Sequence, residues 1–250
     1  MIRIKSPSEI KKMRAAGKLA AEVLQYIQEY VVVGQNTGEI DRLCHEFILK
    51  NGAIPAPLNY HGFPKSICTS VNNIVCHGIP DPEQILKDGD IINVDVTVIV
   101  DGYHGDTSKT YMVGNVKDST KLLVERTENA MMRGIQAIKP NSFLYEVGKS
   151  IEKYVSKFGY SIVRDYGGHG IGKEFHEDPH VYHFYTPANR IRLRPGMIFT
   201  VEPMIIEGDY EVITSQTDGW TVTTKDNSLT AQFEHTVLVT PKGYEILTKI

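Results

Sequence analysis

The chain has 250 residues, of which 41% are hydrophobic and 23% charged, so it is long enough to bury a core and too apolar for wholesale disorder. Its 27 basic and 30 acidic residues leave a formal net charge of −3, which gives no footprint for sequence-specific nucleic-acid binding or for an anionic membrane. No apolar run approaches the roughly 18 residues of a membrane span, and the first residues contain no apolar targeting segment, so we expect a cytoplasmic protein.

Two helices are expected near the N-terminus. The first should begin after Ser6, because Ser6-Pro7-Ser8-Glu9 combines a capping serine, a proline at the first helical position and a glutamate two positions later. The second should run from about Thr37 to Lys50 and end at Asn51-Gly52. The next segment, residues 53–82, is rich in Pro, Gly, Asn and His, and predicts loops with short extended pieces.

The middle of the chain predicts a β-hairpin over residues 90–113. The apolar run 91–100 is followed by Asp101-Gly102, which is a strong signal for a two-residue turn. Two further helices are expected at about 119–138 and 142–157, and after Gly159 the chain should be extended and rich in turns.

The order helix, helix, strands therefore occurs twice along the chain. A shift of 107 residues aligns Glu39-Ile40 with Glu146-Val147, and it places Asp95 on Glu202 within similar apolar strands. This predicts one domain over residues 1–250, made of two related halves of about 1–114 and 115–250 around a pseudo-twofold axis. Chance similarity between amphipathic helices is the alternative.

Two acidic residues lie on the predicted hairpin. If Asp101-Gly102 forms the turn, Thr97 lies opposite Asp106, and Asp95 shares their face of the sheet. The two carboxylates are then diagonal neighbours, about 7–8 Å apart at the backbone. Two ionised carboxylates in an apolar hairpin repel each other and require a positive partner, for which a metal ion is favoured and an Arg or Lys is the alternative.

Three further residues have the character of metal ligands. His169 is surrounded by four glycines, which would allow a ligand to approach closely, and Glu202 and Glu234 each interrupt an apolar strand. Four acids and a histidine suit two divalent ions of the Mn, Fe, Co or Zn type rather than a thiolate site. Such a pair of ions generates hydroxide and polarises a carbonyl, so the pattern indicates a metal-dependent hydrolase.

The remaining histidines and the cysteines are less informative. His77 lies in a loop between apolar flanks and is a candidate proton donor or shuttle, with a hydrogen-bonded loop histidine as the alternative. His180 and His183 are expected in a solvent-exposed loop. An odd number of cysteines without a Cys-x-x-Cys spacing predicts reduced thiols in a reducing compartment, namely those of Cys44, Cys68 and Cys76.

Five long stretches, in order along the chain, resemble the type I methionine aminopeptidases. They are YHGFPKSICTSVNNIVCHGIP (60–80), GDIINVDVTVIVDGYHGDTSKTY (89–111), YGGHGIGKEFHEDPHV (166–181), GMIFTVEPM (196–204) and DGWTVTTKDNSLTAQFEHTVLVT (218–240). The resemblance implies the α+β pita-bread fold of creatinases and aminopeptidases, in which helices cover a curved antiparallel sheet and the halves are related by a pseudo-twofold axis.

The same resemblance implies an activity and its partners. The catalytic domain would remove the initiator methionine from nascent polypeptides when the second residue is small, with a hydroxide held by two divalent ions (Co, Mn, Fe, Zn or Ni) attacking the scissile amide carbonyl. Its partners would be nascent N-termini and the ribosome surface, and the enzyme is expected to be a monomer.

Roles for individual residues follow from the resemblance. Asp106 and Glu234 would bridge the two ions, Asp95 would bind one ion, and His169 with Glu202 would bind the other. Glu202 would also shuttle a proton.

The substrate would be held by a further set of side chains. His77 would contact it near the scissile amide, and His176 would stabilise the developing oxyanion. A monovalent cation is expected near Asn72. The methionine pocket would be formed by aromatic walls and a sulfur, which suit a flexible thioether: Tyr60, Phe63, Cys68, Phe175 and Trp220.

Two residues depart from the family pattern. Phe63 stands where bacterial members commonly have tyrosine, and Pro57 stands where some have cysteine, so both bear on substrate preference rather than on the reaction. Two alternatives remain at this point: a proline-specific peptidase of the same fold, whose histidines lie in different sequence contexts, and an inactive binding module on the same fold, which would lack metal ligands that this chain retains.

Overall fold

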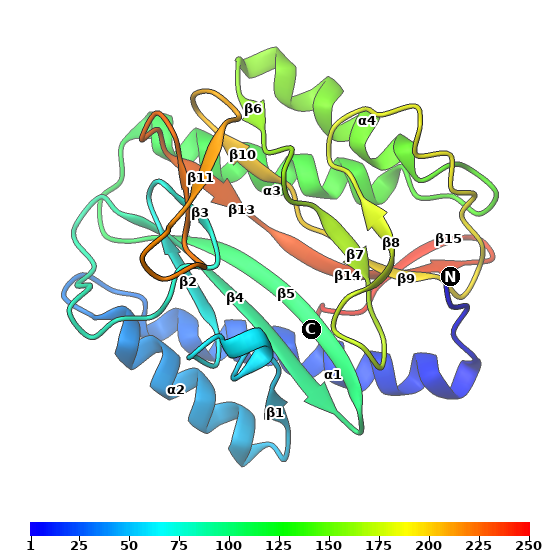
Figure 1. Ribbon diagram of the computed structural model, residues 1–250, viewed down its shortest axis with the longest axis horizontal. Coiled ribbons are helices and arrows are strands. Elements are labelled where there is room, and N and C mark those ends of the chain that lie inside the picture. Colours follow the sequence, from blue (N-terminus) through cyan, green and yellow to red (C-terminus); the bar gives the residue numbers. More distant parts are fainter.

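The computed structural model describes residues 1–250 and is organised around a nine-stranded antiparallel sheet (Figure 1). The strand order is β1-β4-β5-β14-β9-β7-β8, with β2 also paired to β4 and β15 also paired to β14. The strands of this sheet are β1 (Ile54–Pro55), β2 (Cys68–Val71), β4 (Ile91–Val100), β5 (Tyr103–Met112), β7 (Gly168–Gly170), β8 (Glu177–Val181), β9 (Ile198–Val201), β14 (Glu234–Thr240) and β15 (Gly243–Ile246).

Two three-stranded sheets complete the β-structure. One has the order β13-β10-β6 and the other β11-β12-β3. Their strands are β3 (Ile74–Cys76), β6 (Ser161–Ile162), β10 (Met204–Ile206), β11 (Val212–Thr214), β12 (Val222–Thr224) and β13 (Thr230–Gln232). Five of these six strands therefore come from the part of the chain after Gly159 that was expected to be extended and turn-rich.

The first helix begins where the sequence predicts, and the second has the predicted bounds. α1 (Pro7–Ile27) begins with a full capping box: the Glu9 backbone donates to the Ser6 hydroxyl at 3.4 Å, and the Ser6 backbone donates to the Glu9 carboxylate at 2.9 Å. α2 (Thr37–Lys50) begins after Asn36, whose side chain accepts the Glu39 N–H at 2.8 Å. Short 3₁₀ segments lie at Gln28–Tyr30, Tyr60–Gly62 and Ser156–Phe158.

The second pair of helices is α3 (Asp118–Gln136) and α4 (Tyr145–Val155). The sequence predicted that α4 would begin at about residue 142, which is three residues too early. The Asn141 and Leu144 N–H groups donate to the carbonyls of Leu193 and Ile191, both at 2.8 Å. This pairing with a distant segment, which includes a bridge between Phe143 and Arg192, keeps residues 141–144 out of the helix, so the tertiary contact overrides the helical pattern.

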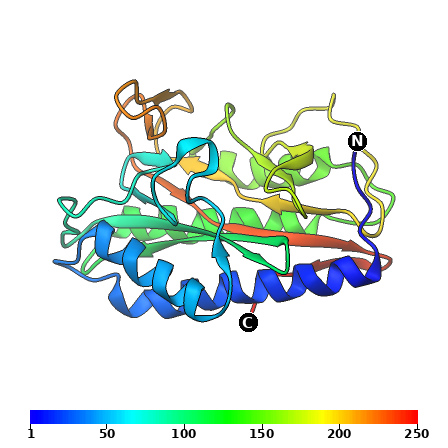
Figure 2. The same ribbon diagram turned by 60° about the horizontal axis from the view of Figure 1, so that its bottom comes forward.

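The four helices cover the sheet as two pairs. Figure 1 shows α1 and α2 along one side and α3 and α4 along the other, and Figure 2 shows α1 and α2 below β4 and β5. Gly105 on β5 permits the close approach of α1, because a Cβ there would lie 2.3 Å from the Ala16 carbonyl carbon. No helix is both long and apolar enough to cross a membrane.

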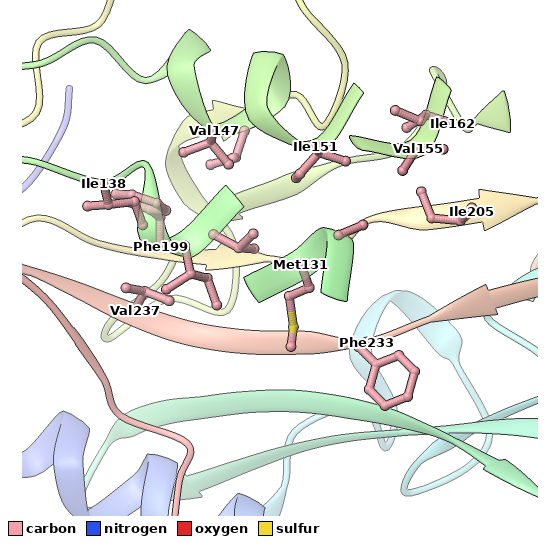
Figure 3. Packing of buried hydrophobic residues seen from close by; sticks show 14 of the residues in the cluster. Met131, Ile138, Val147, Ile151, Val155, Ile162, Phe199, Ile205, Phe233 and Val237 are labelled. Atoms are coloured by element: carbon pink, nitrogen blue, oxygen red, sulfur yellow. The ribbon is translucent and has the colours of Figure 1, made fainter. Parts of the chain in front are cut away.

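Each helix pair encloses its own apolar core. A cluster of 19 buried residues lies among α1, α2 and β4, and a cluster of 23 lies among α3, α4, β9 and β14. Figure 3 shows part of the second cluster, with Met131 of α3, Ile151 of α4 and Phe199 of β9 in one apolar layer. Two cores, with β5 and β14 adjacent at the centre of the sheet, are what two related halves would give. The division into halves at about residue 114 stays a prediction.

Candidate metal and peptide site

The hairpin of β4 and β5 has the predicted register. Thr97 pairs with Asp106 and Val100 with Tyr103, on either side of the turn at Asp101-Gly102. Asp95 and Asp106 therefore share one face of the sheet, and the Thr97 hydroxyl donates to Asp106 Oδ1 at 2.7 Å.

The centre of the sheet brings the acids of the C-terminal half to this hairpin. β14 pairs with β5 so that Glu234 lies opposite Ser108, and with β9 so that His235 lies opposite Val201. Glu202 directly follows β9 in the chain. The four acids thus come from four segments that lie side by side in the sheet, in the order β4, β5, β14 and β9. In the chain they span residues 95–234, which is more than half of its length.

Three of the predicted ligands form a compact group. Asp106, His169 and Glu234 each offer a ligand atom, and these atoms lie within 4.8 Å of one another. His169 Nε2 lies 3.5 Å from Asp106 Oδ2 and 3.8 Å from Glu202 Oε1, whereas its Nδ1 lies 3.0 Å from the Gly170 carbonyl oxygen. A proton on Nδ1 satisfies that carbonyl and leaves the lone pair of Nε2 for a metal ion.

The electrostatics of these acids favour a bound cation. Burial, reinforced by the neighbouring carboxylates, raises the pKa of Asp95 and Glu234 well above their usual ranges. Burial also raises the pKa of Glu202, to about 7. No Lys or Arg forms an ion pair with any of the four acids, so the Lys or Arg alternative is wrong. Clustered oxygen donors and one imidazole fit a divalent metal ion.

His169 responds in the opposite sense to its burial. Burial alone lowers the pKa of an imidazole, but the hydrogen bond to Asp106 and the charge of Glu202 outweigh it and raise the pKa of His169. Asp106 and Glu202 therefore favour a positive charge on the His169 imidazole, and they would attract a bound metal ion for the same reason.

The glycines around His169 have a structural reason. A Cβ at Gly168 would lie 2.4 Å from the Thr200 carbonyl oxygen, and a Cβ at Gly170 would lie 2.0 Å from the Asp178 carbonyl oxygen. Strand β7 runs between β9 and β8, and only glycine allows these backbones to pack so closely. The glycine pattern thus reports backbone packing around His169 as much as access for a ligand.

A single cavity of about 660 Å³ contains the whole predicted site. All twelve side chains expected at the site border it: Tyr60, Phe63, Cys68, His77, Asp95, Asp106, His169, Phe175, His176, Glu202, Trp220 and Glu234. Pro57, one of the two departures from the family pattern, also lies on its wall. Its volume is in the range of small-ligand pockets.

One end of the cavity is aromatic and apolar. The rings of Phe63 and Trp220 meet edge-to-face with centroids 5.2 Å apart, and the Met204 side chain also faces the cavity. Cys68 pairs with Asp95 across β2 and β4, and burial raises the pKa of its thiol, so it is neutral. The three cysteines are all free, as the sequence predicts, and the structure shows that all are buried. This end can hold a flexible apolar side chain.

Two neutral histidines also border the cavity, His77 beside Trp220 and His176 beside His169. Burial and the neighbouring His169 lower the pKa of His176 to about 4, and the Tyr60 hydroxyl lies 2.8 Å from its Nδ1. Burial also lowers the pKa of His77, whose backbone has the left-handed φ of 56° that is unusual for a residue with a side chain. Such a conformation at a cavity wall is typical of a residue held for function.

The prediction for His183 is wrong. Its side chain is 2% exposed, its Nε2 accepts the backbone N–H of Glu202 at 3.0 Å, and burial lowers its pKa to about 3. His180 is exposed as expected, but it lies on strand β8 and borders the cavity. Both histidines follow the glycine-rich segment closely, and no periodicity in the sequence distinguishes the buried one from the exposed one.

Sequence reasoning also missed the residues that hold the Glu202 carboxylate. The Thr200 hydroxyl donates to Oε1 at 2.6 Å, and the Gln232 amide donates to Oε2 at 3.3 Å. Thr200 lies two residues before Glu202, so the alternation of side chains along a strand could have pointed to it. Gln232 comes from β13 and carries no such signal.

Comparison with known proteins places the chain in a family. Residues 11–241 match metallopeptidase family M24. The methionine aminopeptidase of Rickettsia prowazekii is 53% identical over 247 residues, which cover 99% of this chain and 95% of that protein. The methionine aminopeptidase of Escherichia coli K12 is 52% identical over 248 residues, with coverage of 99% and 94%. The chain belongs to the methionine aminopeptidases of family M24.

Solved structures agree with this assignment. The methionine aminopeptidases of R. prowazekii and Thermotoga maritima superpose with TM-scores of 0.97, at 53% and 42% identity and with both chains fully covered. The prolidase of Pyrococcus horikoshii has a TM-score of 0.76 at 23% identity, covering 98% of this chain and 63% of that one, which shows a shared fold alone. The predicted α+β pita-bread fold is therefore confirmed.

Proposed function

We propose that this chain removes an N-terminal methionine from polypeptides whose second residue is small. The observation that carries the proposal is the arrangement of one cavity, in which a carboxylate and imidazole group suited to divalent ions adjoins an aromatic, sulfur-containing end of suitable size for methionine. The relatives that carry the name methionine aminopeptidase match along essentially the whole chain, which supports the same activity.

The acids and His169 would hold two divalent ions. Asp106 and Glu234 lie on adjacent central strands and would bridge the pair. Asp95 would complete the site of one ion, and His169 with Glu202 that of the other. When bound, such ions lower the pKa of water and polarise a carbonyl group. Cobalt, manganese, iron, zinc and nickel all accept this donor set.

The histidines would act on the peptide itself. We assign the Tyr60 hydroxyl as the donor to His176 Nδ1, which leaves the ring proton on Nε2 to donate to the oxyanion that develops on the carbonyl oxygen. The lowered pKa of His176 keeps this ring neutral near pH 7, with a single N–H. His77, at the cavity wall beside Trp220, would contact the substrate near the scissile amide.

Glu202 would move the proton that hydrolysis requires. Water adds to the carbonyl carbon, the C–N bond breaks, and the proton released by the water is transferred to the leaving amine. Glu202 is buried at the cavity, and its carboxylate would accept this proton and return it to the amine. Thr200 and Gln232 keep its carboxylate in place.

Further partners are part of the proposal. The substrates would be nascent polypeptide N-termini, encountered at the ribosome surface in the cytoplasm, and the enzyme would act as a monomer. A monovalent cation is proposed near Asn72, which has a left-handed φ of 56°. There the Asn72 Oδ1 accepts the Ile91 N–H at 3.1 Å and its amide donates to Asp90 at 2.8 Å, so the side chain is already fixed beside a carboxylate.

The deciding experiment is a panel of Met-X-Ser peptides, in which X runs from glycine to tryptophan, assayed with each of the five metals on metal-stripped protein. We expect hydrolysis only after a metal is added, rates that fall as X becomes larger, and loss of activity with a chelator. Matched peptides with norleucine or lysine in place of methionine test the apolar end of the cavity. Cleavage in the presence of chelator, or preference for Xaa-Pro dipeptides, would contradict the proposal.

A further inference from the structure

The segment that precedes α1 contains an unusual lysine. Lys5 is only 5% exposed, and its ammonium group forms an ion pair with the carboxylate of Glu177, which is also buried. The Lys5 backbone N–H is fixed too, since it donates to the Gly196 carbonyl at 2.8 Å. Buried lysines are rare unless they are paired, and a buried pair holds its two chain segments in one relative position.

Glu177 directly follows His176 in the chain. Its second oxygen accepts the Glu174 N–H at 3.4 Å, and this bond closes the turn that carries Phe175 and His176. The Lys5 side chain also lies against Gly172 at the start of this turn, where a Cβ would come within 2.7 Å of Lys5 Cε. The lysine thus contacts both ends of the short loop that presents His176 to the cavity.

A stack of rings connects this loop to the sheet. The Gly172 carbonyl accepts the backbone N–H of His104 on β5 at 2.9 Å. The His104 ring lies parallel to Phe175, at 5.5 Å between centroids, and Phe175 lies parallel to His176, at 4.4 Å. Because Glu177 is adjacent to His176 in the chain and the His176 ring is packed in this stack, a displacement of Glu177 would also displace the imidazole of His176.

We propose that Lys5 is a positioning residue for His176. It does not border the cavity and would not touch substrate; its ion pair with Glu177 ties the N-terminal segment to the loop and fixes the donor geometry of the imidazole. This inference rests on the proposed role of His176. Loss of a fixed donor position lowers kcat without a matching rise in KM, because the interaction is made in the transition state.

The test uses four variants of the full-length enzyme, measured on Met-Ala-Ser with saturating metal. They are Lys5→Met, His176→Ala, the combination of these two, and the control Arg14→Met. Arg14 is a fair control because it forms a well-aligned ion pair with Glu245, at 2.6 and 2.8 Å, on the exposed side of α1. The readouts are kcat, KM, bound metal and melting temperature.

We expect Lys5→Met to lower kcat about tenfold with KM and bound metal nearly unchanged, as for a catalytic group displaced by a fraction of an ångström. In the His176→Ala background, Lys5→Met should cause no further loss, because the group that it positions is gone. Arg14→Met should keep the wild-type kcat. A purely structural role would lower the melting temperature and leave this coupling at zero.

Each outcome is decisive. Equal losses from Lys5→Met in both backgrounds, or an unchanged kcat, would overturn the positioning role while leaving the proposed function intact. An unchanged kcat in His176→Ala would instead overturn the role of His176. If Lys5→Met does not fold, Lys5→Met combined with Glu177→Gln replaces it, since that pair leaves no buried charge unpaired. The same coupling to His176→Ala is then expected, and its absence contradicts the proposal.

Discussion

The two strand pairs that carry the four acids achieve the same placement by different means. Asp95 and Asp106 lie 11 residues apart on β4 and β5, which a two-residue turn connects. The pairing of these two strands alone therefore sets the position of one carboxylate relative to the other. Glu202 and Glu234 lie 32 residues apart, and the chain between them forms β10 to β13 and part of the cavity wall. The first pair is a local feature, whereas the second depends on tertiary structure.

The supporting contacts of the two pairs also differ. The Asp106 carboxylate accepts from the Thr97 hydroxyl directly across the hairpin and from the His169 imidazole, and the Thr236 hydroxyl of β14 bonds the Asp106 backbone. Glu202 is held by Thr200, by Gln232 from another sheet and, through its backbone, by His183. The N-terminal pair is thus placed mainly by its hairpin, and the C-terminal pair by contacts from other parts of the chain. Each of the following experiments tests this division.

The largest effect is expected from Asp106→Asn. Asp106 is central in the acidic group, so its loss should remove bound metal and lower kcat/KM by about 10³-fold or more, since a metal ion supplies several kcal/mol of transition-state stabilisation. The metal-free variant should nevertheless melt higher than metal-free wild type, because the Asp106 charge that disfavours ionisation of Asp95 and Glu234 is gone. Metal analysis, peptide kinetics and thermal melting measure these effects.

The control for this variant is Asp101→Asn, at the exposed turn of the same hairpin. Asp101 has a left-handed φ of 49°, which asparagine tolerates well, so fold and activity should be retained. A metal-free Asp106→Asn protein that melts lower than wild type would show that the acids are not in repulsion, and it would remove the main electrostatic argument for a bound cation.

His176→Ala should have the next largest effect. Loss of one oxyanion donor typically lowers kcat by about 10²–10³-fold, and bound metal should be unchanged because His176 lies outside the compact ligand group. The matched control is His45→Gln, which alters a histidine outside the cavity that bonds the Ser66 hydroxyl. A parallel fall of metal content and kcat would mean that His176 is a ligand rather than a donor.

Variants of Thr97 and Thr200 allow a direct comparison of the two strand pairs. Thr97→Val and Thr200→Val are close in shape and each removes one hydroxyl that donates to a carboxylate, at 2.7 and 2.6 Å. Loss of such support typically weakens metal binding or activity by about 10–100-fold. Thr200→Val should have the larger effect, because the Thr200 hydroxyl also accepts the backbone N–H of His169 at 2.9 Å. Metal titration of both variants measures the difference, and a larger loss in Thr97→Val would reverse the comparison.

The same contrast explains how far the sequence alone could predict the site. The hairpin register, the capped start of α1 and the bounds of α2 follow from local rules, and the structure has them as predicted. The position of Glu234 opposite Ser108 depends on pairing between segments over 100 residues apart, and only the 107-residue repeat and the family resemblance pointed to it. The predicted site residues border one cavity, but their roles stay predictions.

The failures have a common physical cause. The late start of α4 and the burial of His183 both arise from contacts with chain segments that no periodicity can indicate. The ion pair of Lys5 with Glu177 belongs to the same class, since a lysine in the polar segment before a helix resembles any solvated residue. Local patterns identify which residues are apolar or acidic, and only the assembled sheet decides which of them meet.

The smallest effect concerns stability and pH, and it tests whether Glu202 is the titrating member of the acidic group. Its folded pKa of about 7 lies above the ordinary value of 4.5, so the folded metal-free protein retains a proton that the unfolded chain has lost. Stability from this proton is present at low pH and is lost as pH rises through 7, by up to about 1.4 kcal/mol per pH unit.

The buried histidines with lowered pKa values act in the opposite direction, but only below about pH 6.5, where the unfolded imidazoles are protonated. Between pH 6.5 and 8 the melting temperature of metal-free wild type should therefore fall by a few degrees, whereas that of metal-free Glu202→Gln should fall less. Parallel melting curves for the two proteins would assign the titration to Asp95, His169 or Glu234, and Glu202 would then not be the titrating member of the group.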